Sequence, residues 1–166
     1  MQNILITGAD GFIGKNLSMS LGKLFKITPT TRNIKDPNFF KKMNLNPIKW
    51  DIQKNPNVSL PGGIWIHLAS ITDLNYCNNN YKRAESINSD AIKNVLQYAE
   101  NSGCMKFIYI STLGVYGNPE YLPTDENHPL LPIEKYSLTK LNGEKNILSF
   151  VPKTKMQLLI IRPFNI

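Results

Sequence analysis

The sequence lacks the features that mark secreted, membrane-spanning and zinc-binding proteins. Its only cysteines are Cys77 and Cys104, and neither stands in a C-x-x-C or Cys/His pattern. This argues against a disulfide framework and a metal site, and it is typical of a reducing cytoplasm. No apolar run approaches the length that spans a bilayer, and the N-terminus has no basic segment followed by an apolar one. We therefore expect a cytoplasmic chain with no metal and no membrane partner.

Clustered charge is also missing, although the formal net charge is +7. The basic residues are scattered, whereas an arm that binds nucleic acid needs a run of them, so we expect no nucleic-acid partner. A small part of the positive charge could serve the phosphates of a nucleotide. The chain has 166 residues, of which 42% are hydrophobic, and this is enough to form one domain with a substantial core.

Short apolar runs alternate along the chain with segments of helical period, which is typical of strand-helix-strand units. The expected fold class is α/β: a doubly wound parallel sheet of Rossmann type, with about six strands and helices on both faces. The candidate strands are residues 3–7, 25–30, 47–50, 63–68, 106–111 and 157–161.

Three helices are expected between these strands. The first begins near residue 11, and Gly22 is placed to end it in a left-handed conformation. The second spans 81–102, with Gly103 as its stop signal, and the third begins near Lys135.

The segment 114–132 contains four prolines and is expected to be a long loop, a type of segment that is usually functional. His128 lies in this loop and is expected at the surface. His67 lies in an apolar strand and is expected to be a core histidine with its hydrogen bonds satisfied.

A glycine-rich loop follows the first strand and opens the first helix. It reads G-x-x-G-x-x-G, with glycines at Gly8, Gly11 and Gly14. In this context glycines allow a tight turn and a close approach to a pyrophosphate, which the helix N-terminus then binds. We therefore assign cofactor binding to the three glycines and to Phe12 and Ile13.

Several other short motifs occur in a fixed order behind this loop. They are W-D-I at 50–52, H-L-A-S at 67–70, I-N at 87–88, S-T-L-G-V-Y-G at 111–117, Y-S-L-T-K at 136–140 and R-P-F-N at 162–165. Together with the glycine loop, this set resembles the extended short-chain dehydrogenases/reductases, and more narrowly the NAD-dependent epimerase/dehydratase family. The resemblance covers the whole chain.

The resemblance implies that Thr112, Tyr136 and Lys140 are catalytic. In the family pattern the tyrosine transfers the proton, the lysine also holds the nicotinamide ribose, and the threonine binds the reacting oxygen of the substrate. Lys140 lies one helical turn after Tyr136, so its ammonium is expected to favour the phenolate. Lowering a tyrosine pKa by about three units corresponds to roughly 4 kcal/mol.

The cofactor implied by the resemblance is NADP or NAD. Arg32 follows the second strand where NAD-preferring proteins carry an acidic residue, so NADP is slightly favoured, unless Arg32 is only an exposed cation. Asp51 and Ile52 are expected to meet the adenine. Asn88 matches a helix asparagine of the family but could equally be a surface amide. Three residues at the end of the fourth strand are expected to line the cofactor: Leu68, Ala69 and Ser70.

The implied activity is 4-epimerisation or keto reduction of a nucleotide sugar. Leu113 and Gly114 stand where dehydratases carry an Asp-Glu pair, so dehydration is disfavoured. A truncated, non-catalytic NADP-binding module or redox sensor is the alternative. Family members continue after the R-P-F-N motif into a substrate-binding region, so residues 1–166 are expected to be the NAD(P)-binding domain alone. Asn165 would be among the first residues to meet the substrate, and a homodimer is left open.

Overall fold

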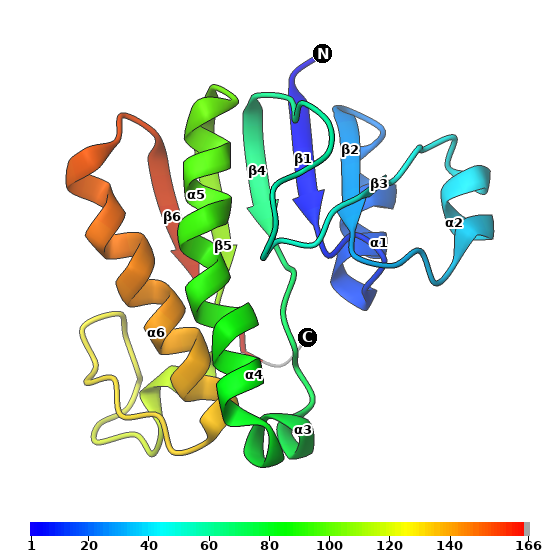
Figure 1. Ribbon diagram of the computed structural model, residues 1–166. Helices are drawn as coiled ribbons and strands as arrows, with labels where there is room; N and C mark the ends of the chain where they lie inside the picture. Colours follow the sequence, from blue (N-terminus) through cyan, green and yellow to red (C-terminus); the bar gives the residue numbers. More distant parts are fainter. Residues whose placement is uncertain (165–166) are drawn as a thin grey trace.

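The computed structural model describes residues 1–164, and its centre is a single parallel sheet. The strand order is β3-β2-β1-β4-β5-β6 (Figure 1). This is the doubly wound order of dinucleotide-binding folds, which confirms the predicted fold class. Each strand overlaps its predicted range; the bounds are β1 Asn3–Thr7, β2 Lys26–Thr31, β3 Ile48–Lys49, β4 Gly63–His67, β5 Cys104–Ile110 and β6 Gln157–Ile161.

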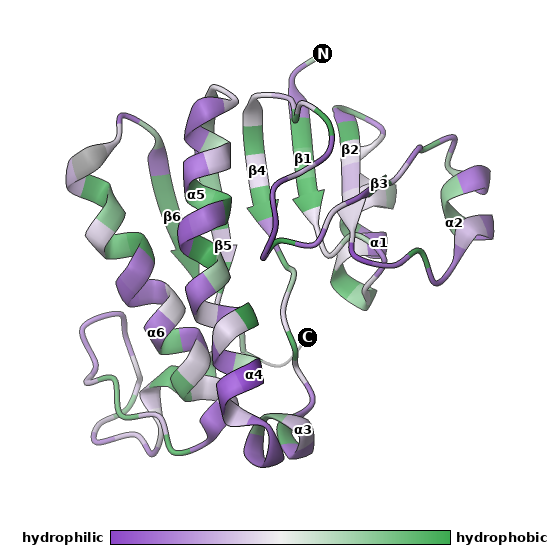
Figure 2. Cartoon of the chain, in the orientation of Figure 1, coloured by the Kyte–Doolittle hydropathy of each residue, from purple (hydrophilic) through white to green (hydrophobic). Residues whose placement is uncertain are grey.

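One face of the sheet carries α1 (Phe12–Leu21), which lies behind β1 and β2, and α2 (Pro37–Lys42), which lies at the edge of the molecule beyond β3 (Figure 1). Alternate strand residues such as Ile4 and Ile6 point to this side and form a core with Phe40 of α2. The central strands β1 and β4 are mostly hydrophobic along their length (Figure 2), as expected where a parallel strand is buried on both faces.

The other face carries the larger core, beneath a long helical segment and α6 (Lys135–Phe150). Leu5, Trp65, Phe107 and Tyr109 are all buried on this side of the sheet. The helices pack on them through apolar residues that repeat at three and four, including Ile92, Val95, Leu96 and Ile147.

The predicted helix over 81–102 is one continuous helical segment with an unpredicted π turn. It comprises α4 (Tyr81–Glu85), the π segment η1 (Ser86–Asp90) and α5 (Ala91–Asn101). Gly103 follows with φ of +73°, which confirms it as the stop signal. The expectation for Gly22 was wrong: its φ is −61°, because its amide still donates to the Ser18 carbonyl and continues the helical pattern.

Two short helices were not predicted, α2 and α3 (Leu74–Asn79). Each begins after an aspartate, Asp36 or Asp73, whose carboxylate accepts a hydrogen bond from a first-turn amide. Residues 1–164 also contain two 3-10 turns, η2 (Leu113–Tyr116) at the start of the predicted loop and η3 (Val151–Lys153).

Neither histidine behaves fully as expected. His128 is buried rather than at the surface, because Nε2 accepts from the Glu120 amide and the ring packs against Tyr116 and Tyr121. His67 is in the core, but only Nδ1 is bonded and Nε2 has no partner within residues 1–164. Burial, followed by the charge of Lys140, lowers the pKa of His67 to about 3, so the ring is neutral.

Both cysteines are buried free thiols. Burial raises the pKa of Cys104 to about 11 and also raises that of Cys77, so neither is a thiolate near neutral pH. Among residues 1–164 no three His, Cys, Asp or Glu side chains gather into a group that could hold a metal ion. Within the same range, no helix has both the length and the apolar character needed to cross a bilayer.

Candidate cofactor and active site

A crevice of about 780 Å³ opens at the carboxyl ends of β1, β2, β4 and β5. The strand order reverses between β1 and β4, and open α/β sheets bind ligands at such a reversal. The volume lies within the range of small-molecule sites. Nearly all the predicted site residues line it: Gly8, Gly11, Phe12, Ile13, Gly14, Arg32, Asp51, Ile52, Leu68, Ala69, Ser70, Thr112, Tyr136 and Lys140.

The glycine loop forms one wall of the crevice, and its geometry requires glycine at two positions. Gly8 has φ of +67°, and a Cβ there would lie 2.9 Å from the Ala69 nitrogen. A Cβ on Gly14 would lie 2.6 Å from both the Cα of Ala9 and the carbonyl oxygen of Gly8. Helix α1 therefore packs directly on the loop. Its N-cap, Gly11, provides no side-chain cap, which leaves the first-turn amides available to an anion at the crevice.

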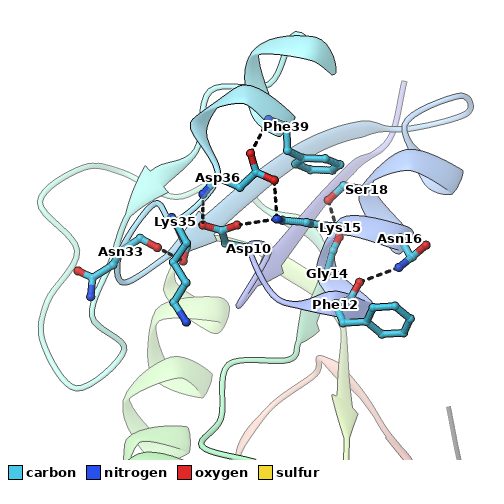
Figure 3. A network of polar contacts seen from close by, with 11 residues as sticks. Asp10, Phe12, Gly14, Lys15, Asn16, Ser18, Asn33, Lys35, Asp36 and Phe39 are labelled. Atoms are coloured by element: carbon cyan, nitrogen blue, oxygen red, sulfur yellow. Dashed lines mark hydrogen bonds and ion pairs between the residues drawn. The ribbon is translucent and has the colours of Figure 1, made fainter.

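Asp10, inside this loop, joins it to the segment after β2 (Figure 3). Its Oδ2 accepts hydrogen bonds from the backbone amides of Lys35 and Asp36, the latter at 3.2 Å. Lys15 Nζ lies 3.3 Å from Asp10 Oδ1 and 2.8 Å from Asp36 Oδ2. The two carboxylates and the ammonium thus fix the β2–α2 segment against the glycine loop. The motif interpretation missed Asp10 because it stands at a variable position of the glycine pattern.

The segment that Asp10 fixes presents cations to the crevice. Arg32 and Lys35 are exposed and line it together with Asn33. Arg32 forms no ion pair with any residue in the range 1–164, which leaves its guanidinium available. Asp36 faces Lys15 instead, and the hydrogen bond from Lys15 lowers the pKa of that carboxyl.

Asp51 and Ile52, which were expected to meet the adenine, follow β3 and line the crevice. Ile52 is buried at the crevice wall, and Asp51 Oδ1 accepts from the Gln53 amide at 3.1 Å. Gln53 reaches across to Ser86 of η1, with Nε2 and Oγ 2.6 Å apart. These contacts hold the two residues at the edge of the site.

The crevice wall formed by residues 68–72 is held by hydrogen bonds with Thr7 at its start and with Asn88 at Ile71. The Thr7 hydroxyl accepts from the amides of Leu68 and Ala69, at 3.1 and 3.2 Å. Because it accepts twice, its own hydrogen is directed to His67 Nδ1, which lies 2.9 Å away.

Asn88 is 1% exposed and does not line the crevice. Its amide group bonds both the nitrogen and the oxygen of Ile71, at 2.7 and 2.8 Å, and also donates to Thr139 Oγ1. Its side chain is therefore bonded to the crevice wall at Ile71, which does line the crevice. The sequence left open whether Asn88 binds the cofactor or is a surface amide. Its buried position behind the crevice wall differs from both.

Thr112, Tyr136 and Lys140 come together at the β5 side of the crevice. Tyr136 and Lys140 are separated by one turn of α6, and Thr112 follows β5 at the start of η2. The Thr112 hydroxyl accepts from the Gly114 amide at 3.3 Å, which leaves its hydrogen free to be donated. Lys140 Nζ lies 4.1 Å from the centre of the Tyr109 ring.

The structure reverses the expected electrostatics of this trio. Burial, followed by the charge that the Cys77 thiol acquires at alkaline pH, raises the pKa of Tyr136 to about 12 instead of lowering it. Lys140 is 2% exposed, and burial lowers its pKa to about 7, although the negative charge of Glu144 opposes the shift. Desolvation is therefore the largest influence on the pKa of both groups, and the attraction between ammonium and phenolate that sequence spacing suggested sets neither value. A lysine that titrates near neutrality inside a crevice is a feature of functional sites.

The geometry of the site agrees with a match to a known family. The sequence model of the NAD dependent epimerase/dehydratase family matches residues 4–166. This chain belongs to that family. Asn165, which was expected to be among the first residues to meet the substrate, lies outside the described residues.

Individual relatives agree with this assignment. A putative UDP-glucose 4-epimerase of Methanocaldococcus jannaschii is 26% identical over 98% of this chain. Among solved structures, the UDP-N-acetylglucosamine 4-epimerase of Methanobrevibacter ruminantium in complex with UDP-N-acetylmuramic acid matches with a TM-score of 0.83 and 25% identity, over 97% of this chain and 54% of its own. RMD from Pseudomonas aeruginosa, complexed with NADPH, matches with a TM-score of 0.76 and 25% identity, over 99% of this chain and 55% of its own. The chain covers 55% of the Methanocaldococcus protein and so spans about half the length of the curated relatives that it matches.

Proposed function

We propose that this chain provides the cofactor site and the proton-transfer residues of an NAD(P)-dependent enzyme that epimerises or reduces a nucleotide sugar. One observation carries the proposal: a single crevice is lined by the glycine loop, by the segment after β2 and by Thr112, Tyr136 and Lys140. A dinucleotide needs the first two, and a reaction at a sugar hydroxyl needs the last three.

The residues present suit a nicotinamide dinucleotide. The first turn of α1 offers uncapped amides to the pyrophosphate, and the glycines leave no Cβ in the way of its approach. Asp51 and Ile52 would hold the adenine, and Lys140 the nicotinamide ribose. When bound, such a cofactor would supply the acceptor and donor of a hydride.

We assign proton transfer to Tyr136, whose phenol lines the crevice and is protonated at neutral pH. Thr112 would donate its free hydroxyl hydrogen to the reacting oxygen of the sugar. Lys140 would stabilise the phenolate as the Tyr136 proton leaves, since an ammonium one helical turn away favours the charged form. The high pKa of Tyr136 and the low pKa of Lys140 both arise from burial, so a positive charge entering the crevice would stabilise the phenolate further.

We further propose NADP as the preferred cofactor. The support is the exposed Arg32 and Lys35 pair, held beside the glycine loop by Asp10. An arginine suits a 2′-phosphate because it donates charge-assisted hydrogen bonds in a planar fork. The family description names NAD and one solved neighbour carries NADPH, so both cofactors belong in the test.

The selection of the sugar would lie mostly outside this chain, because the chain matches only about half of its relatives. We therefore expect residues 1–166 to bind cofactor but to turn over nucleotide sugars negligibly, whereas the protein at its natural length should be active. The loss of activity would follow from the loss of substrate positioning.

Replacement of Tyr136 tests the proposed function. In the protein at its natural length, Tyr136→Phe should remove most of kcat and leave cofactor affinity nearly unchanged, because only the phenol oxygen is lost. Lys140→Ala should reduce both kcat and cofactor affinity. Measurement of kcat with UDP-sugars and of cofactor affinity by calorimetry separates the two effects. An active Tyr136→Phe enzyme would contradict the assignment.

A further inference from the structure

Glu144 is a buried carboxylate one helical turn beyond Lys140 on α6, and it does not line the crevice. It is 1% exposed, and both of its oxygens are occupied. Oε2 accepts from Arg162 at 2.7 Å, while Oε1 accepts from Arg162 Nε at 3.1 Å and from the Ser111 hydroxyl. The carboxylate is therefore held in one orientation by two partners from other elements.

Arg162 extends this contact to the turn that follows β5. Its Nη1 donates to the Tyr116 hydroxyl at 3.0 Å, and its guanidinium carbon lies 5.0 Å from the centre of that ring. Tyr116 belongs to η2, and Ser111 directly follows β5. The Glu144–Arg162 pair therefore connects α6, the end of β5, η2 and the residue after β6.

Thr112 lies in the middle of this arrangement. The amide of Ser111 donates to the Ile161 carbonyl at 2.7 Å, and the amide of Leu113 donates to the Pro163 carbonyl at 3.1 Å. The residues on either side of Thr112 are thus bonded to the residues on either side of Arg162. A displacement of Arg162 would be passed directly to Thr112.

The charged and titratable groups around Lys140 come from three elements. They are Tyr136 and Glu144 on α6, Tyr109 on β5 and His67 on β4. His67 and Tyr109 are neutral at physiological pH, because burial lowers the pKa of the former and raises that of the latter. Tyr136 is also protonated there. Glu144 therefore provides the negative charge near Lys140, and it raises the pKa of Lys140 against the effect of burial.

A buried ion pair gives little net stability relative to apolar residues, so its presence here needs another reason. We propose that Glu144 and Arg162 are positioning residues of the reaction, which fix the Thr112 turn against the helix of Tyr136 and Lys140 and place a negative charge one turn from Lys140. This inference rests on the proposed function, since it concerns how the same three residues are held.

The test uses the protein at its natural length and measures kcat, KM and cofactor affinity across pH. Glu144→Gln keeps the shape of the side chain and removes its charge. We expect kcat to fall about tenfold or more, with cofactor affinity changed by less than about threefold, because the variant acts on positioning rather than binding. The decline of kcat at alkaline pH should begin at a lower pH, since Lys140 loses its proton more readily without the charge.

Three further variants make the outcome specific. Glu144→Asp keeps the charge, so its alkaline decline should stay at the wild-type pH although kcat falls. Arg162→Lys replaces the three guanidinium nitrogens that bond Glu144 and Tyr116 with a single ammonium, and it should also lower kcat. Glu100→Gln, on α5 and outside the crevice lining, removes an equal charge and should behave as wild type.

The inference is overturned if Glu144→Gln lowers kcat equally at every pH, as a purely structural role would, or keeps wild-type activity. If Glu144→Gln does not fold, the other two variants decide. The inference is overturned if Arg162→Lys keeps full kcat, or if the alkaline decline of kcat in Glu144→Asp begins at a different pH from that of the wild type. Failure of the proposed function has a different signature: Tyr136→Phe would remain active whatever the Glu144 variants do.

Discussion

Replacement of Arg32 by alanine should weaken the binding of NADP far more than that of NAD. Arg32 follows β2, lines the crevice and forms no ion pair within residues 1–164, so its guanidinium is free to bind a 2′-phosphate. Asp10 bonds the amide of Asp36 and so fixes the segment that carries Arg32. Binding would therefore require little ordering of this backbone.

The size of the effect follows from the kind of contact that is lost. A hydrogen bond to a charged group contributes about 1.5 to 3 kcal/mol. This corresponds to a loss of NADP affinity of roughly 10-fold to 150-fold. Arg32 is exposed, so solvent screening favours the lower end of this range. The affinity for NAD, which lacks the phosphate, should change by less than about threefold.

Calorimetric titration of each variant with NADP and with NAD measures this difference directly. Lys42→Ala is the matched control, because Lys42 is an exposed cation on α2 that does not line the crevice. It should leave both affinities unchanged. Equal weakening of NADP and NAD by Arg32→Ala would refute the assignment of Arg32 to the 2′-phosphate.

Two further predictions concern stability as well as function. Gly14→Ala should lower stability by about 1 to 3 kcal/mol and also abolish measurable cofactor binding, because its Cβ would meet loop backbone that cannot move aside. Gly103 has φ of +73°, and a Cβ added there would have nothing within 4 Å. Gly103→Ala should therefore lower the stability by roughly 1 to 2 kcal/mol through backbone strain and leave cofactor binding intact. Equal cofactor binding by the Gly14 and Gly103 variants would contradict the role of the glycine loop. Lys140 has a folded-state pKa of about 7, below its usual value, so from pH 7 upward the unfolded chain binds more protons at this site and stability should rise. Urea unfolding between pH 7 and 9 should show this rise in the wild-type protein relative to Lys140→Met, and parallel curves would contradict it.

The sequence predicted the doubly wound parallel sheet and most of the residues that line the crevice, because both depend on local patterns. Parallel strands between helices bring their carboxyl ends to one edge, so motifs that follow each strand meet there. The end of the long helical segment at Gly103 and the start of α6 at Lys135 were predicted equally well. The short helices α2 and α3 were missed because they are only about one and a half turns long, too short for a visible apolar period.

The remaining differences arise from burial, which a linear sequence does not show. Tyr136 and Lys140 have the spacing for mutual stabilisation, but desolvation moves their pKa values apart instead. His128 lies in a proline-rich loop yet is buried against two tyrosines. Glu144 could have been suggested by its four-residue spacing from Lys140, but its partners Ser111 and Arg162 are distant in sequence. Asp10 likewise acquires its role only through the segment after β2.

The binding of a nicotinamide dinucleotide tests the central claim most directly. A folded sample of the protein at its natural length should bind NADP or NAD in a calorimetric titration, and Gly14→Ala should abolish the signal. We expect a dissociation constant well below the millimolar range for at least one cofactor, since the crevice is preformed and its pyrophosphate amides are uncapped. The absence of any heat or thermal stabilisation with either cofactor at millimolar concentration would contradict the account.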